Sequence, residues 1–221
     1  MSHKPGVLWS LYVGLQNLVL YVAMISPSWM TANRITWVRT LLGVPIILAI
    51  SQGMTWQAFT MYVIAWVMDF LDGVWAKAET RKGIERDQNY GAFLDAFCDK
   101  VQLVIMVPFI WGLCGFEGPW YLQVQLAILT VFLVFIEVTL AIVRLQDYLA
   151  TKRNPDANRA IRSTGWGKIK LNLEVVGLGG IILCYPDLTH WGGYVGLAAL
   201  LLAIPFGMMS LRQKLFTRKE Q

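Results

Sequence analysis

The sequence has little charge. Only 15% of its 221 residues are Asp, Glu, Lys or Arg, whereas 56% are hydrophobic, and soluble domains carry roughly 25% charged residues. So few polar side chains poorly cover a surface that faces water, and the high apolar content excludes intrinsic disorder. The composition therefore argues against a soluble enzyme and favours a membrane protein, in agreement with a mean hydropathy of +0.51.

Cysteine is also scarce. The three cysteines, Cys98, Cys114 and Cys184, are scattered and form no C-x-x-C pair, so their spacing predicts neither a zinc site nor a disulfide framework. We interpret them as ordinary residues of apolar pockets. A disulfide between Cys114 and Cys184 stays open, because we expect both residues near the same membrane face.

Long apolar runs are what the sequence has in abundance. Such runs predict membrane-spanning helices, since only closed backbone hydrogen bonding is stable in lipid. The fold class we predict is all-α: an integral membrane bundle of six transmembrane helices, preceded by one N-terminal helix. The six expected spans cover residues 35–50, 56–71, 101–115, 121–149, 171–185 and 191–211.

Lysine and arginine are absent from three of the expected loops, at 51–55, 114–120 and 186–190. All nineteen cations therefore fall on the other side of the membrane or in the adjoining helices, and the positive-inside rule makes that side cytoplasmic. The net charge of +5 thus reports orientation and affinity for membrane lipid. We expect no nucleic-acid partner.

The first apolar run, residues 7–25, is ambiguous. It contains polar residues and aromatics that suit a helix lying in the membrane interface about as well as a spanning helix. We favour the interfacial helix, and a seventh span stays open. The expected organisation is a single domain over 1–221, with an interfacial helix in 1–33, a six-helix core in 34–211 and a basic tail in 212–221.

Four aspartates stand in two matched pairs on either side of one inner loop. Asp69 and Asp72, three residues apart, end one apolar helix, and Asp95 and Asp99, four apart, begin the next. Both spacings place the two side chains on one helix face. Four converging carboxylates select a hard ion such as Mg²⁺, Mn²⁺ or Ca²⁺ and resemble the ligand sets that hold two metals for phosphoryl transfer.

Two other interpretations of these aspartates stay open. Asp69 could simply pair with Lys77 or Arg81, and aspartates at helix ends are often merely solvated. A cation-coupled transporter would also place acids in its membrane helices. Transporter sites lie near the midplane, however, whereas these four aspartates are expected at the inner edge.

The pattern around the aspartates resembles the signature of the CDP-alcohol phosphatidyltransferase family, D-x2-D-G-x2-A-R-x8-G-x3-D-x3-D. Two features depart from it: Lys77 stands where arginine is usual, and thirteen residues separate Lys77 from Gly91. Lysine keeps the charge but lacks the planar fork that grips phosphate oxygens in pairs. Seven of the eight fixed residues are present, namely Asp69, Asp72, Gly73, Ala76, Gly91, Asp95 and Asp99.

The resemblance implies a metal-dependent enzyme of phospholipid biosynthesis that binds CDP-diacylglycerol and a small water-soluble alcohol and releases CMP. It implies two Mg²⁺ or Mn²⁺ ions on Asp69, Asp72, Asp95 and Asp99, with Asp99 as the general base. Homodimers are common among such relatives. The residues implied in CDP binding are Asn33, Thr36, Asp69, Gly73, Ala76, Lys77 and Gly91.

Within the family, further segments resemble bacterial phosphatidylglycerophosphate synthases, which suggests a bacterial inner membrane and glycerol 3-phosphate as the acceptor. These segments are Asn33, Thr36 and Arg39; Glu137 and Arg144; and Gly167-Lys168-Ile169-Lys170-Leu171-x2-Glu174.

Arg144, Lys168 and Lys170 are the expected phosphate partners of that acceptor. Inositol phosphate, serine or an amino alcohol stays open as the acceptor. A buried ion pair involving Glu137, and an i, i+4 pair of Lys170 with Glu174, stay open as structural roles.

Overall fold

The structure of the protein is a computed structural model, which describes residues 7–27, 29–84, 87–153 and 164–217. Within these residues the chain forms α-helices and no β-strand. The helices are α1 (Val7–Ile25), α2 (Ala32–Leu41), α3 (Gly43–Ser51), α4 (Thr55–Arg81), α5 (Gln88–Cys114), α6 (Trp120–Arg153), α7 (Gly165–Cys184) and α8 (Trp191–Thr217).

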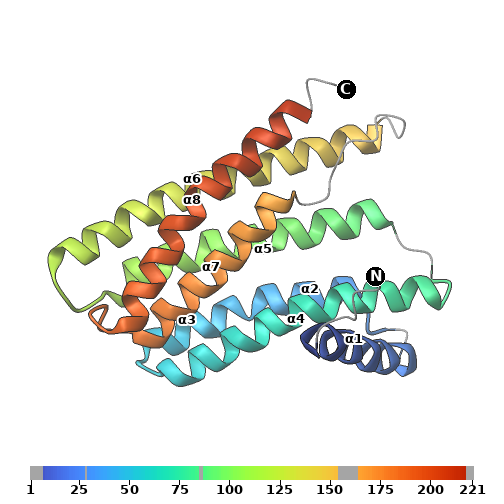
Figure 1. The fold of residues 1–221 in the computed structure, drawn as a ribbon, viewed down its shortest axis with the longest axis horizontal. Helices are drawn as coiled ribbons and strands as arrows, with labels where there is room; N and C mark the ends of the chain where they lie inside the picture. Colours follow the sequence, from blue (N-terminus) through green and yellow to red (C-terminus); the bar gives the residue numbers. More distant parts are fainter. Residues whose placement is uncertain (1–6, 28, 85–86, 154–163, 218–221) are drawn as a thin grey trace.

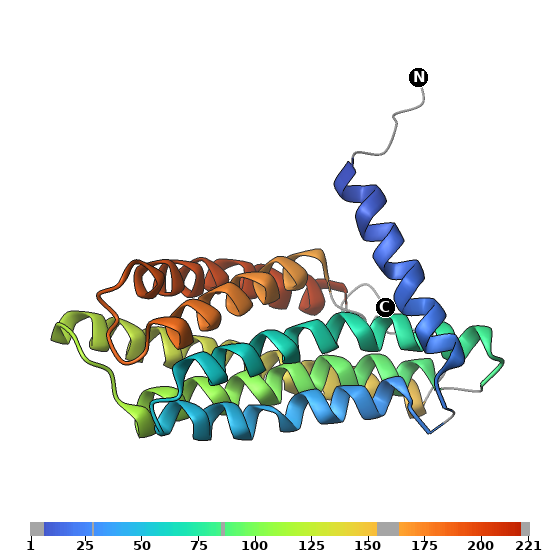
Figure 2. The ribbon, with the colours of Figure 1, turned by 90° about the horizontal axis from the view of Figure 1, so that it is seen from below.

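Six rods run side by side along the long axis of the molecule: α2 with α3, then α4, α5, α6, α7 and α8 (Figures 1 and 2). The first rod is interrupted at Leu42. Pro45 explains the interruption, because a proline lacks the N–H that would bond the carbonyl four residues earlier and its ring crowds that carbonyl. The predicted all-α helical bundle is confirmed.

Four of these rods are long and apolar enough to cross a membrane, judged by length and composition: Ala32–Ser51, α4, α6 and α8. The remaining two, α5 and α7, pack among them, α5 against α2, α3 and α6, and α7 against α4 and α8. The expectation of a membrane-embedded helical bundle thus agrees with the fold.

The three loops without cations lie at one end of the bundle, on the left in Figure 1. Two of these loops contact each other there, since the backbone N–H of Glu117 donates to the carbonyl of Pro186 at 2.8 Å. Cys184, close to this end, carries a free thiol, which does not support the disulfide that its position left open. The last turns of α4, α6 and α8, which contain Arg81, Arg153 and Lys214, lie at the other end of the bundle, as the charge pattern predicts.

Helices α7 and α8 are held together by a very close backbone approach. A Cβ added to Gly196 would lie 2.8 Å from the carbonyl oxygen of Gly177, and one on Gly177 would lie 2.6 Å from the Leu200 side chain. Small residues allow membrane helices to pack at this distance. The buried apolar core at this end includes Leu178, Ile181, Ile182, Leu197 and Leu200, with residues of α3 to α6.

Helix α1 projects away from the bundle at a steep angle instead of running along it (Figure 2). Its last turns pack on α2 and α4 through a small cluster that includes Ala23, Ile35 and Trp75. The carboxylate of Glu79 accepts the N–H of Ala32 at 2.8 Å and so anchors the start of α2 on α4. A seventh span would run parallel to the other rods, so this transverse course favours the interfacial helix.

The helices extend well beyond the apolar runs at the basic end. Asp72 was expected at a helix end, but α4 continues to Arg81, and α5 begins at Gln88, seven residues before Asp95. The segment after Asp72 is rich in alanine, lysine and arginine, which are strong helix formers. The aspartates therefore lie inside two helices whose ends project beyond the apolar part of the bundle, and the expectation of helix-end positions was wrong.

Candidate active site

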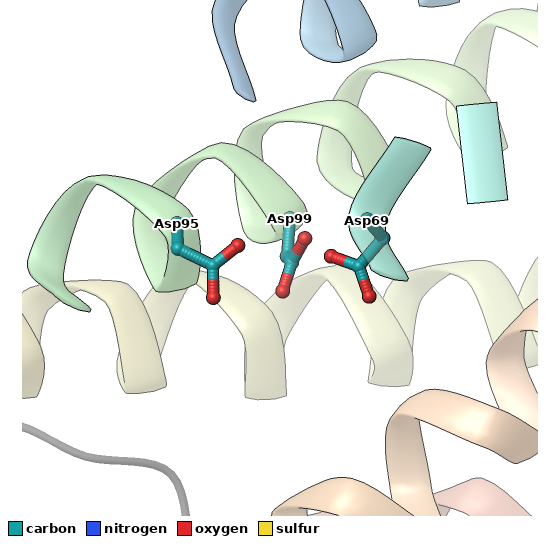
Figure 3. Close-up of side chains that lie close together, drawn as sticks. All are labelled: Asp69, Asp95 and Asp99. Carbon is teal, nitrogen blue, oxygen red and sulfur yellow. The ribbon is translucent and has the colours of Figure 1, made fainter. Parts of the chain in front are cut away.

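One arginine forms ion pairs with aspartates of both α4 and α5. Arg39, buried on α2, forms an ion pair with Asp69, and its Nη2 lies 2.7 Å from Oδ1 of Asp99 and 3.2 Å from Oδ1 of Asp95. Figure 3 shows the three carboxylates pointing toward one another, Asp69 from α4 and the other two from successive turns of α5. The i, i+4 spacing read from the sequence does place Asp95 and Asp99 on one face.

The three carboxylates suit a divalent metal ion. One oxygen each from Asp69, Asp95 and Asp99 lies within 4.8 Å of the others, and oxygen-only donors prefer Mg²⁺ or Mn²⁺ to zinc. The guanidinium of Arg39 already forms ion pairs with all three carboxylates, so the group attracts cations. The residues present therefore fit a hard cation at this position.

Asp72 lies beside this group, next to a separate cavity. Its Oδ2 accepts the hydroxyl of Thr36 at 2.8 Å, and the side chain is buried. The cavity has a volume of about 320 Å³ and also borders Asp95. Five of the residues that the sequence implicates in CDP binding line it: Thr36, Gly73, Ala76, Lys77 and Gly91.

Gly73 leaves this cavity open. A Cβ built on Gly73 would meet no atom within 4 Å, so the glycine is not required by helix packing. Lys77, one turn further along α4, is exposed at the rim of the same cavity. Asn33 is half-buried near the start of α2 and is not among the residues that line the cavities described here.

A second cavity, of about 480 Å³, lies on the other side of Asp95. Three elements contribute cations to it: Lys100 from α5, Arg144 from α6, and Lys168 and Lys170 from α7. The carboxylates of Asp69, Asp95 and Asp99 form part of the same lining. The structure thus brings the three expected acceptor residues, Arg144, Lys168 and Lys170, to one cavity with the aspartates.

Two lysines and two glutamates form a buried network at this cavity. Nζ of Lys100 lies 2.6 Å from Oε2 of Glu137, and Lys170 pairs with Glu137 and with both oxygens of Glu174 at 2.8 Å. All four side chains are buried. Both structural roles left open by the sequence are therefore observed: Glu137 belongs to a buried ion pair, and Lys170 pairs with Glu174.

Arg144 differs from these lysines. Its Nη1 donates to the backbone carbonyl of Ala96 at 3.3 Å, while its Nε is buried without a hydrogen-bond partner. Within the part of the chain that the structure describes, no carboxylate forms an ion pair with Arg144. Asp95, Asp99 and Asp147 act on Arg144 electrostatically from beyond ion-pair distance. Because a buried polar group is costly without a hydrogen-bond partner, the guanidinium of Arg144 still has a donor to offer to an anion in this cavity.

Comparison with known proteins places this site in a family. The sequence profile described as CDP-alcohol phosphatidyltransferase matches residues 29–209. The chain belongs to the CDP-alcohol phosphatidyltransferase family. The matched region contains every aspartate of the pattern, all residues that line the first cavity, and all but Ser210 of those that line the second.

One curated relative is the CDP-diacylglycerol–glycerol-3-phosphate 3-phosphatidyltransferase of Cereibacter sphaeroides, to which the chain is 35% identical over 65 residues. The aligned segment covers 29% of this chain and 27% of the relative. No solved structure matches the protein.

For this member of the family, the sequence did not reveal the contacts of Arg39 and Lys100. Arg39 was noted only as part of a resemblance, yet it contacts three of the four aspartates. A signal was present, because Arg39 is the sole charge in the apolar run 35–50 and a charge inside a membrane helix usually has a partner.

Proposed function

We propose that this protein transfers the phosphatidyl group of CDP-diacylglycerol to a small hydroxylated acceptor and releases CMP, as a step of phospholipid biosynthesis. The observation that carries the proposal is the position of Asp95 between two cavities, one lined by the CDP-binding residues of the family pattern and the other by cations. A donor and an acceptor held in these cavities would meet at the aspartates.

The donor cavity suits a nucleotide diphosphate. Its lining combines Lys77, a cation for the pyrophosphate, with the open space beside Gly73. We assign Asn33, Thr36, Asp69, Gly73, Ala76, Lys77 and Gly91 to CDP binding.

Asp69, Asp72, Asp95 and Asp99 would hold two Mg²⁺ or Mn²⁺ ions, which would neutralise the charge of the pyrophosphate during transfer. The residues of the chain then orient the acceptor and move its proton. The acceptor hydroxyl oxygen attacks the phosphorus that carries the lipid, and its proton passes to Asp99, the general base. The bond from that phosphorus to the oxygen of CMP breaks. Asp99 suits this role because it lines the acceptor cavity.

Glycerol 3-phosphate is the acceptor we favour. The buried Arg144, whose Nε has no hydrogen-bond partner, and the exposed Lys168 at the same cavity suit a phosphate group. The name of the Cereibacter sphaeroides relative supports the same acceptor. Serine and amino alcohols carry no phosphate to satisfy Arg144.

The location we propose is the bacterial inner membrane, with the aspartates on the cytoplasmic side. The cation-free loops at the far end of the bundle support this orientation. Both CMP and a charged acceptor are soluble in water, so an opening to the cytoplasm suits their exchange.

Transfer of label into lipid tests the proposal. The purified protein in vesicles would receive CDP-diacylglycerol, Mg²⁺ and one radiolabelled acceptor at a time: glycerol 3-phosphate, inositol phosphate, serine or ethanolamine. We expect label in the chloroform-soluble fraction with glycerol 3-phosphate. Label found only with another acceptor would replace that assignment. Label that accumulates inside sealed vesicles without entering lipid would instead indicate a cation-coupled transporter.

A further inference from the structure

We propose that the buried network of Lys100, Glu137, Lys170 and Glu174 withdraws Lys170 from ligand binding and so limits the acceptor cavity to one anionic group, bound by Arg144 and Lys168. This inference rests on the proposed function and deepens it. Glu174 is then a positioning residue that sets the charge of the acceptor accepted by the site.

The network is balanced in charge. Its two lysines and two glutamates sum to zero, and each ammonium lies against at least one carboxylate. Lys170 is the most heavily paired, because it contacts Glu137 from α6 and both oxygens of Glu174 from its own helix. An ammonium has three protons to donate, and these three carboxylate contacts leave none for a phosphate.

The aliphatic stem of Lys170 is also confined. A Cβ added to Gly207 of α8 would lie 3.1 Å from Cδ of Lys170 and 2.9 Å from the Ile136 side chain. The backbone of α8 therefore packs directly on the lysine stem. Lys170 has no room on this side to swing its ammonium away from Glu174 and into the cavity.

Arg144 and Lys168 are the cations that remain for a ligand. Arg144 has a buried Nε without a partner, and Lys168 is exposed at the cavity. One phosphate monoester would balance these two charges. If Lys170 were free, three cations would face the cavity and a more highly charged acceptor would be preferred.

The net charge of the network should control the affinity for an anion, and Lys170 should not bind the anion directly. Three variants distinguish control by net charge from direct binding by Lys170. Glu174→Gln gives the network a charge of +1, Lys170→Met gives −1, and the double variant Lys170→Met/Glu174→Gln restores zero while Lys100 and Glu137 stay paired.

The first measurement is the affinity for inorganic phosphate. It is determined from the rise in thermal midpoint that phosphate causes in the purified full-length protein, in detergent and without divalent metal. Relative to wild type, we expect about tenfold tighter binding in Glu174→Gln and about tenfold weaker binding in Lys170→Met, since a unit charge acts over short distances in a weakly screening interior. The double variant should stay within about twofold of wild type. In Arg144→Met, phosphate should no longer raise the thermal midpoint. That loss would show that the phosphate binds in this cavity.

The second measurement is the KM for glycerol 3-phosphate in the same variants, which should follow the same order while kcat changes much less. A purely structural role would lower the folded fraction without moving KM. If the double variant binds phosphate as weakly as Lys170→Met, then Lys170 is itself a ligand and the proposal is wrong. Equal affinity in all variants would also overturn it.

The two proposals fail in different ways. Because phosphate binding requires no turnover, the charge series can hold even if wild type does not use glycerol 3-phosphate, in which case only the acceptor assignment fails. Should Lys170→Met not fold, the comparison of wild type, Glu174→Gln and the double variant still decides the question.

Discussion

Nη2 of Arg39 lies 2.7 Å from Oδ1 of Asp99, and the same guanidinium reaches Asp69 and Asp95. A side chain of α2 therefore holds together carboxylates from α4 and α5, which would otherwise repel one another. A divalent metal ion held by these aspartates, as we propose, would satisfy the same negative charge as Arg39. The stability of the bundle would then depend on the occupancy of the proposed metal site.

Replacement of Arg39 should make the protein depend on metal for stability. In Arg39→Met the three carboxylates lose their buried partner. Because Asp69 and Asp95 are partly exposed, we expect a cost below the roughly 3–5 kcal/mol of breaking a fully buried pair. We expect a lower thermal midpoint in EDTA and a larger rise on addition of Mg²⁺ than in wild type, measured in detergent. Arg39→Lys, the control that keeps the charge, should recover part of the loss. Equal Mg²⁺ shifts in wild type and Arg39→Met would contradict this account.

Two glycines inside helices should respond oppositely to substitution. Gly73 faces open space in the donor cavity, whereas a Cβ on Gly196 would meet the carbonyl of Gly177 at 2.8 Å. Gly73→Leu should not destabilise the fold, because it gains about 1 kcal/mol of helix propensity, but should reduce transfer at least about a hundredfold by filling the cavity.

Gly196→Ala should instead lose about 1–3 kcal/mol of stability through overpacking and keep normal activity per folded molecule. Thermal midpoints and rates of CMP release measured on both variants decide between these outcomes. A destabilised Gly73→Leu with a normal KM for CDP-diacylglycerol would show that Gly73 serves packing.

The anchor between α2 and α4 depends on Glu79. Its carboxylate accepts the N–H of Ala32 at the buried start of α2, so Glu79→Ala leaves that donor without its partner and should cost about 1–3 kcal/mol. Thr80→Ala is a matched control on the exposed face of the same turn. The thermal midpoint of Glu79→Ala should lie clearly below that of Thr80→Ala. Equal midpoints would mean that the contact between Glu79 and Ala32 does not contribute to stability.

The orientation of the bundle can be tested with single cysteines in the turn before α4 and at the last residue of α4. Gln52→Cys and Arg81→Cys are both exposed and would be introduced after Cys98, Cys114 and Cys184 are replaced by alanine. A thiol reagent that cannot cross membranes should label the first in intact cells and the second only in inverted vesicles. The reverse pattern would place the aspartates outside the cytoplasm.

Much of this arrangement is predictable because periodicity and charge placement are local properties of the sequence. The apolar runs predicted the bundle, and the spacing of Asp95 and Asp99 predicted a shared helix face. The ends of α4 and α5 were placed too close to the aspartates, since hydropathy marks the lipid-facing part of a helix and not its hydrogen-bonded length.

Long-range pairing was harder to predict. Asp69 had Lys77 and Arg81 as candidate partners nearby in sequence, but it pairs with Arg39, thirty residues away on another helix. Lys170 was expected to bind phosphate, and its pairing with Glu137 depends on how α6 and α7 pack. Which cations are neutralised within the bundle, and which remain for a ligand, is decided by tertiary structure.

A suitable control acid lies at the opposite end of the bundle. The backbone N–H and hydroxyl of Thr189 donate to Asp187 and lower the pKa of its carboxyl below the ordinary value. Asp187 is therefore ionised at neutral pH, and Asp187→Asn removes one negative charge far from both cavities.

Release of CMP from CDP-diacylglycerol by the purified protein tests the central claim most directly. We predict release only when Mg²⁺ or Mn²⁺ and an acceptor alcohol are both present, a loss of at least about a thousandfold in Asp95→Asn and Asp99→Asn, and a rate within about twofold of wild type in Asp187→Asn. Release that persists at the wild-type rate in Asp95→Asn and Asp99→Asn would contradict the account.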